Sequence, residues 1–153
     1  MVQFIMRREG MRSIIVGVGN PLLGDDAIGL EIARQLRSMG YNAKEAVAGG
    51  IELAEMIAGY DFAIIIDAFH GVGIKEISID EYEESVANHD ISFPSAYKIL
   101  ARYIKMPEVK IIGIGIKKIE VGEQLSSQVE MAIPAAIEIV EKIMEDKNVA
   151  GEG

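Results

Sequence analysis

Residues 15–29 contain an apolar run, a glycine-rich turn and the start of a helical pattern in direct succession. The run ends in Gly17-Val18-Gly19, and Asp25 and Asp26 open the helical pattern. This order predicts a buried strand joined to a helix by a tight loop, the first unit of an α/β fold. A nucleotide-binding turn keeps the positive end of its helix free for phosphate. Because two acids occupy that end here, we expect one to cap the helix and the other to bind a metal.

Strand and helix patterns continue to alternate along the rest of the chain. Strands are expected at 12–18, 42–47, 62–67, 75–82 and 109–116, and helices at 26–39, 51–58, 93–105 and 123–146. The alternation predicts one domain over residues 1–153, a three-layer α/β/α sandwich with a mostly parallel five-stranded twisted sheet. Residues 75–82 are expected to form an antiparallel edge strand. Pro134 is expected to kink the last helix or to mark its start. Residues 1–10 should be a loosely ordered extension and 147–153 a frayed tail.

Composition excludes several classes of function. The chain has 24 acidic and 15 basic residues and a net charge of −9, which argues against nucleic acid or an anionic membrane as partner. No apolar run reaches the ~18 residues that a membrane span needs, and the N-terminus lacks the order of a signal peptide. We therefore expect a cytoplasmic protein. Its low aromatic content and acidic charge favour a monomer.

The absence of cysteine narrows the possible chemistry further. Thiolate nucleophiles and thiolate metal sites are excluded, so any metal must be held by oxygen and imidazole nitrogen. The chain contains two histidines, His70 and His89. No serine-hydrolase elbow, zinc-protease helix, Walker loop or EF-hand loop is present. Leu22 stands where a dinucleotide fingerprint needs its third glycine, which disfavours that cofactor.

The remaining candidates fall at the carboxyl edge of the predicted sheet, where α/β proteins bind ligands. Asp26 lies in the loop after the first strand, and Asp67 closes the predicted third strand. A carboxylate at the end of an apolar run must be satisfied, either by loop amides or by a ligand, and we favour the ligand. The imidazole comes from His89 or His70, and the residues alone leave that choice open. Two carboxylates and one imidazole suit a borderline divalent ion with open positions for substrate or water.

Four segments together resemble the nickel-iron hydrogenase maturation proteases, endopeptidases that trim the hydrogenase large subunit. They are GVGNPLLGDDAIG at 17–29, Gly49-Gly50, IIIDA at 64–68 and HDISF at 89–93. The resemblance extends from residue 12 to about residue 142. It implies a metal-binding and catalytic trio at Asp26, Asp67 and His89, and so it selects His89 over His70. Ala48 departs from the acid that often precedes the glycine pair, which changes the expected shape of the substrate groove.

The resemblance also implies a function. The chain would remove a C-terminal peptide from the nickel-loaded large-subunit precursor of a hydrogenase, with Ni²⁺ supplied by the substrate. Zn²⁺ or Cd²⁺ would suit the same ligands, and the ion would act as a Lewis acid. Asn20, Gly49, Gly50 and His70 are expected to line the groove, with the glycines admitting the substrate backbone and offering an amide to the oxyanion. Two alternatives stay open: a non-catalytic, chaperone-like module that grips the precursor, and a peptidase with its own bound metal.

Overall fold

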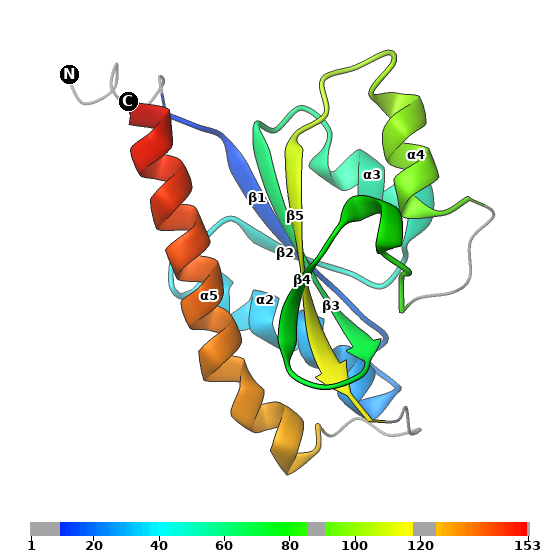
Figure 1. Ribbon diagram of the computed structural model, residues 1–153, viewed down its shortest axis with the longest axis vertical. Helices are drawn as coiled ribbons and strands as arrows, with labels where there is room; N and C mark the ends of the chain where they lie inside the picture. The colour runs from blue at the N-terminus through cyan, green and yellow to red at the C-terminus, as the bar shows by residue number, and fades with distance from the viewer. Residues whose placement is uncertain (1–9, 86–90, 118–124, 153) are drawn as a thin grey trace.

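The computed structural model describes residues 10–85, 91–117 and 125–152, with side chains as far as residue 148. Within these residues, five strands form one sheet in the order β2-β1-β3-β5-β4 (Figure 1). The strands are β1 (Ser13–Val18), β2 (Ala43–Ala46), β3 (Phe62–His70), β4 (Ile74–Ile77) and β5 (Glu108–Ile116). The α-helices are α2 (Ile28–Ser38), α3 (Gly50–Ile57), α4 (Phe93–Leu100) and α5 (Ser127–Glu152), and short 3₁₀ turns are η1 (Gly24–Ala27) and η2 (Ile79–Glu81).

The pairing of the strands confirms the predicted sheet. Strand β1 pairs in parallel with both β2 and β3, and β3 pairs in parallel with β5. Strand β4 is antiparallel to β5 and forms one edge. Because β1 lies between β2 and β3, the chain leaves β1 toward one side and later returns to the other. The carboxyl ends of β1 and β3 therefore flank the switch in strand order, the position where open α/β sheets bind ligands.

Helices cover both faces of the sheet, as the predicted three-layer sandwich requires. Helices α2 and α5 lie on one face, and α3 and α4 lie on the other (Figure 1). Ile64 and Ile66 of β3 belong to the core under α2 and α5, whereas Ile65 belongs to the core under α3 and α4. This alternation follows from the two-residue period of a strand. The apolar face of α2 packs into the first of these cores, and its members are buried: Ile28, Ile32 and Leu36.

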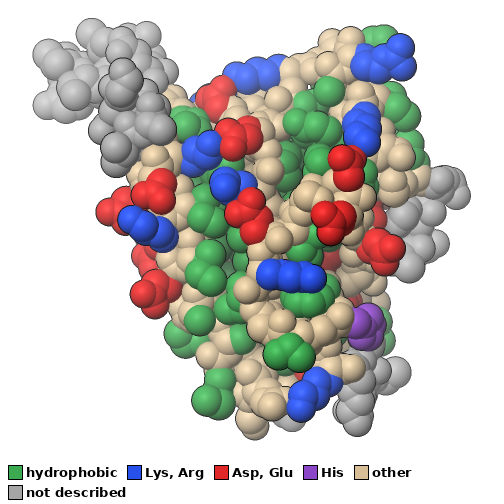
Figure 2. All heavy atoms as spheres, in the orientation of Figure 1, with side chains coloured by type: hydrophobic (Ala, Val, Ile, Leu, Met, Phe, Trp, Pro, Cys, Tyr) green, Lys and Arg blue, Asp and Glu red, His purple; other side chains and the backbone are tan. Residues whose placement is uncertain are grey.

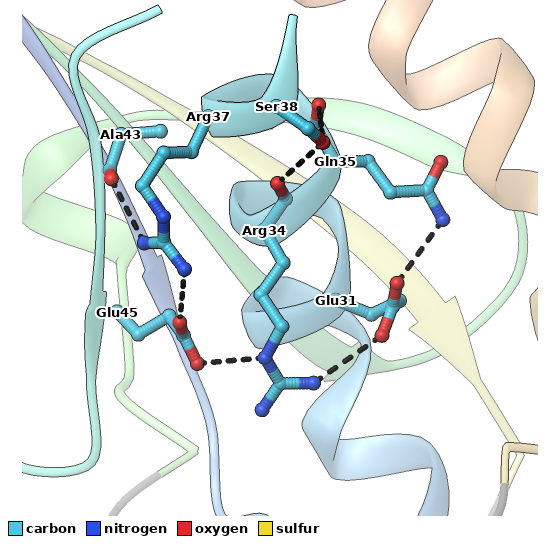
Figure 3. Close-up of polar contacts among 7 residues, drawn as sticks. All are labelled: Glu31, Arg34, Gln35, Arg37, Ser38, Ala43 and Glu45. Carbon is cyan, nitrogen blue, oxygen red and sulfur yellow. Dashed lines mark hydrogen bonds and ion pairs between the residues drawn. The ribbon is translucent and has the colours of Figure 1, made fainter.

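A polar network joins α2 to the edge strand β2 (Figure 3). Glu45 of β2 pairs with Arg34 at 3.0 Å and with Arg37 at 2.8 Å. Arg37 also donates to the carbonyl oxygen of Ala43 at 3.1 Å. Exposed ion pairs stabilise a fold by at most about 1 kcal/mol each. Their second effect is to place charge along a short edge strand, which discourages pairing with another chain.

Before the last helix, three element boundaries differ from the predictions by three residues or more. Strand β3 does not end at Asp67 but continues to His70, because its pairing with β5 runs on to the pair His70 and Ile116. The predicted strand over 75–82 ends at Ile77, and η2 follows it. Helix α4 ends at Leu100 rather than at residue 105, and the chain continues in turns.

The last helix also differs from its prediction. Helix α5 begins at Ser127 and continues past Pro134 to Glu152, so residues 147–152 are helical rather than frayed. Proline removes one hydrogen bond near the start of this helix, but its buried side chains hold it against the sheet on both sides of that position: Val129, Ile133, Ala136, Val140 and Met144. The predicted extension, apart from Gly10, lies outside the described residues. Across the described part of the chain, every helix is too short or too polar to span a bilayer.

Candidate active site

The glycines of the 17–29 motif bring the Asp26 loop against the ends of the strands. A Cβ atom at Gly29 would lie 2.5 Å from the carbonyl oxygens of both Val18 and Ile66. A Cβ atom at Gly19 would lie 2.4 Å from the carbonyl oxygen of Asp26. Side chains at these positions would push the loop away from the sheet. The motif therefore serves close backbone packing, and it places Asp26 in η1 at 0% exposure.

The two adjacent acids have different partners, and neither caps a helix as predicted. No side-chain capping bond is present at the start of η1 or α2. The Asp25 carboxylate instead accepts hydrogen bonds from the N–H and the hydroxyl of Ser126, at 2.6 and 2.9 Å. Ser126 directly precedes α5, so Asp25 ties the loop after β1 to the last helix. The capping prediction is wrong for Asp25 because both of its oxygens bond to Ser126 of a distant segment.

Asp26 carries an unpartnered oxygen in the interior. Its Oδ2 accepts a hydrogen bond from the Asn20 N–H at 3.0 Å. Its Oδ1 is buried and has no hydrogen-bond partner among the described residues. Burial raises the pKa of Asp26, and the Asn20 N–H, the Ser85 side chain and the charge of His70 oppose this rise. An orphaned buried acceptor is costly, so this oxygen is suited to an external ligand.

Asp67 is equally buried, at 1% exposure, but it is fully partnered. Oδ1 accepts hydrogen bonds from the Ala68 N–H at 2.8 Å and the Ser85 hydroxyl at 2.5 Å. Oδ2 accepts from the Tyr82 hydroxyl at 2.7 Å and the Ser85 N–H at 3.0 Å. Burial raises the pKa of Asp67 to about 7, although these four donors act in the opposite direction. Desolvation therefore outweighs the hydrogen bonds at this carboxyl.

Ser85 and Tyr82 surround the Asp67 carboxyl, and neither residue was predicted from the sequence. Ser85 donates to Asp67 and also lowers the pKa of Asp26. Burial raises the pKa of Tyr82 well above 10, and the charges of Asp67 and Asp26 add to the rise, so Tyr82 remains a phenol that donates. Tyr82 closed a predicted strand, and Ser85 followed it in a segment without periodicity. A buried carboxylate requires hydrogen-bond donors, but the sequence of the chain does not indicate which residues supply them.

The predicted groove residues have well-defined surroundings. The Asn20 side chain accepts the Leu22 N–H at 2.9 Å and thereby shapes the loop before η1. Gly49 and Gly50 are buried beside Glu84, whose carboxylate accepts the Gly50 N–H at 3.1 Å. Because the Gly50 amide is already engaged, it is not free for an oxyanion in this arrangement. The predicted role of the glycine pair in the groove stays a prediction.

The structure describes one of the two histidines, His70. His70 is exposed at the end of β3, and its charge lowers the pKa of Asp26. It lines a cavity of about 320 Å³ together with Lys75, Tyr82 and Glu84. His89 lies outside the described residues. Within the residues described, no group of three or more His, Asp or Glu side chains could hold a metal ion. Metal binding by Asp26, Asp67 and His89 therefore stays a prediction.

The fold and the site define an α/β protein with two buried carboxyls, Asp26 in η1 after β1 and Asp67 within β3. The fold is similar to that of known structures. The hydrogenase maturating endopeptidase HybD from Escherichia coli superposes with a TM-score of 0.72, at 24% identity, over 89% of this chain and 93% of that one. The [NiFe] hydrogenase maturation protease HybD from Thermococcus kodakarensis is 31% identical and has a TM-score of 0.60. That match covers 87% of this chain and 99% of the other.

One curated protein is similar in sequence. Protein FrxA from Pyrococcus furiosus is 27% identical over 135 residues, which cover 81% of this chain and 98% of FrxA. No protein-family model matches the chain. The identity and coverage of the Thermococcus structure are sufficient to assign the family. The chain belongs to the [NiFe] hydrogenase maturation proteases and is a peptidase.

Proposed function

We propose that this peptidase acts in the cytoplasm and removes a C-terminal peptide from the nickel-loaded large-subunit precursor of a [NiFe] hydrogenase. The observation that carries the proposal is the buried Oδ1 of Asp26, which has no hydrogen-bond partner among the described residues. Asp26 lies in η1, which follows β1, and Asp67 of β3 supplies a second buried carboxyl. A cation brought by the substrate would satisfy this oxygen and neutralise the two carboxylates.

The donor set fits a borderline divalent ion. Asp26 offers Oδ1, Asp67 offers a carboxylate, and His89 is the proposed imidazole ligand. Mixed oxygen and imidazole ligands suit Ni²⁺ and Zn²⁺, and thiolate ligands are excluded because the chain has no cysteine. Burial raises the pKa of both carboxyls, and it also favours a bound cation. A proton and a metal ion each offset the negative charge of a carboxylate that is shielded from water.

These positions support the following mechanism. A nickel ion carried by the precursor would polarise the scissile carbonyl or make a bound water more acidic. Asp26 and Asp67 would fix the position of the precursor's metal centre relative to the peptide to be cut. A pKa of about 7 allows the Asp67 carboxyl to hold or release a proton near neutral pH when no cation is bound.

Cleavage assays with two forms of the precursor test the proposal. Purified protein is incubated with nickel-loaded and nickel-free precursor, and the mass of the large subunit is measured. Loss of a C-terminal peptide from the loaded form alone is the expected result. Cleavage of both forms would instead indicate a metal held by the peptidase itself. Binding to the loaded precursor without any cleavage would overturn the proposal.

Substitution of the proposed ligands should abolish processing while the fold remains intact. Asp26→Asn, Asp67→Ala and His89→Ala should each reduce the processing rate by more than about 100-fold, because even neighbours of metal ligands contribute 10- to 100-fold. Asp25→Asn is the matched control, since Asp25 is adjacent but bonds to Ser126. It should process at close to the wild-type rate. Circular dichroism checks the fold, and full processing by any of the three variants would remove that residue from the mechanism.

A further inference from the structure

Ser85 contributes two of the four hydrogen bonds that Asp67 accepts. Its hydroxyl lies 2.5 Å from Oδ1 and its N–H lies 3.0 Å from Oδ2. The Tyr82 hydroxyl and the Ala68 N–H supply the other two, at 2.7 and 2.8 Å. A carboxylate offers about four lone-pair positions. Asp67 is therefore saturated by the protein itself, and a cation can bind it only by displacing a donor.

The four donors differ in how easily they can leave. The Ala68 and Ser85 N–H groups belong to the backbone, and Tyr82 is buried with its ring in edge contact with Phe93 at 5.9 Å between centroids. Glu84, next to Ser85, accepts hydrogen bonds from the N–H groups of Gly50 and Phe93. The backbone before Ser85 is thus tied to α3 and α4. The Ser85 hydroxyl can leave by rotation about one side-chain bond, which frees one acceptor position on Oδ1 of Asp67 while the Ala68 N–H stays bound.

The Ser85 side chain also acts on the second carboxyl. It contributes to the environment of Asp26, whose Oδ1 is buried without a partner among the residues that the structure describes. A hydroxyl between two carboxylates supplies part of the positive potential that a cation would supply there. Its removal would leave Asp67 with three donors and would take from Asp26 a group that favours its charged form, which increases the preference of this buried pair for a cation.

We propose that the Ser85 hydroxyl is a displaceable internal partner of Asp67 that competes with divalent cations for this carboxylate. Ser85 is thus a positioning residue that keeps the free protein from capturing loose metal ions. The site then takes an ion only when the precursor presents it with many further contacts. The biological role given to Ser85 rests on the proposed function, but its competition with a cation for Asp67 is a property of the free protein.

Metal titration of the free protein tests the inference. Chelator-treated wild type and Ser85→Ala, both as the full chain, are titrated with Ni²⁺ alone and with Cd²⁺ alone by calorimetry. Ser85→Ala should bind each ion roughly 10- to 100-fold more tightly, the range expected from removing a hydrogen bond to a charged group. Ser85→Thr restores a hydroxyl and should return the affinity to near the wild-type value.

Two controls separate this effect from a general loosening of the protein. Ser78→Ala removes a hydroxyl that donates to the exposed Glu81 at 2.9 Å, so its metal affinity should equal that of wild type. The double variant Ser85→Ala with Asp67→Asn should lose the gain, because the competing carboxylate is gone. If Ser85→Ala does not fold, Ser85→Gly also removes the hydroxyl while it keeps the N–H.

Unchanged or weaker metal binding by the hydroxyl-free variants would overturn the inference, as would a gain that persists without the Asp67 carboxylate. Precursor cleavage is not measured in this experiment. A wild-type protein that fails to cleave the precursor would therefore contradict the proposed function alone. A Ser85→Ala variant with wild-type affinity would contradict the role of Ser85 alone.

Discussion

Asp26 and Asp67 are buried to the same extent, but they differ in how many hydrogen bonds they accept. Among the described residues they are the buried charged side chains, at 0% and 1% exposure. Asp67 accepts four hydrogen bonds, whereas one oxygen of Asp26 accepts none. Such arrangements reduce stability, and they are found where function requires them. At Asp26 the fold keeps a buried acceptor available instead of replacing it with an apolar side chain.

The stability of the protein should depend on pH through Asp67. Burial raises the pKa of this carboxyl from 3.8 to about 7, so the folded protein binds the proton more tightly than the unfolded chain does. This contribution to stability is fully present below pH 4, declines as pH rises from about 4 to about 7, and is absent above that range. A rise of this size corresponds to roughly 4 kcal/mol at most. Urea unfolding at several pH values, with chelator present, should show that Asp67→Asn gains stability relative to wild type as pH rises.

A contrasting carboxyl supplies the control. Hydrogen bonds from Lys105 and the Arg12 N–H lower the pKa of the exposed Asp61. Its contribution is present above about pH 4 and is lost as pH falls, so Asp61→Asn should show the opposite trend. Equal pH dependence of wild type and Asp67→Asn would show that Asp67 has an ordinary pKa in the folded protein.

Helix α2 packs closely against strands β1 and β3 because glycines stand at the contact, Gly17 in β1 and Gly29 in α2. This contact positions the candidate site. A Cβ atom at Gly17 would lie 1.9 Å from the carbonyl oxygen of Gly29, and one at Gly29 would lie 2.5 Å from the carbonyl oxygen of Ile66. The start of the helix therefore packs backbone against backbone. Since η1 directly precedes α2, the same contact sets where Asp26 lies relative to β3.

Gly29→Ala should test this contact. The added methyl group has no space, so the helix start must move, at a cost of about 3 kcal/mol in the free energy of unfolding. Precursor processing should fall as well, because Asp26 moves with η1. Ser38→Ala, at the exposed end of the same helix, should change stability by less than about 0.5 kcal/mol. Urea unfolding measures both, and a Gly29→Ala variant as stable as the control would contradict the proposed packing.

The whole molecule has two cores that share one sheet. Strand residues alternate between the core under α2 and α5 and the core under α3 and α4. The surface carries a net charge of −9, and Figure 2 shows acidic and basic side chains interspersed over the visible face rather than a field of one sign. The face drawn there shows no broad basic surface that would attract a polyanion.

Because both cores include the same strands, they should unfold together. Leu36 of α2 and Leu53 of α3 are each 0% exposed and lie in opposite cores. Leu36→Ala and Leu53→Ala should each lower the free energy of unfolding by about 2–5 kcal/mol. Far-ultraviolet circular dichroism and tyrosine fluorescence should report one coincident transition for each variant. Ile99→Ala, at 47% exposure, is the control with a smaller effect. Two separate transitions would contradict a single cooperative domain.

The sequence alone determined the order of elements, the three-layer architecture and the antiparallel edge strand. Those features follow from hydrophobic periodicity, which reports directly which side of each strand or helix is buried. It also identified Asp26 and Asp67, because acids at the ends of apolar patterns stand out against their surroundings. The boundaries of β3 and α5 were less accurate, since pairing with β5 and packing on the sheet extended both elements beyond their local signals.

Only the tertiary structure decided which groups satisfy these acids. Tyr82 and Ser85 reach Asp67 from 15 and 18 residues further along the chain, and Ser126 reaches Asp25 across 101 residues. Hydrophobic periodicity indicates which side of an element is buried, and it does not reveal such contacts. The burial of a side chain can be predicted from its neighbours in sequence, but its hydrogen-bond partners depend on the path of the whole chain. The same reason explains why the unpartnered oxygen of Asp26 became visible only in three dimensions.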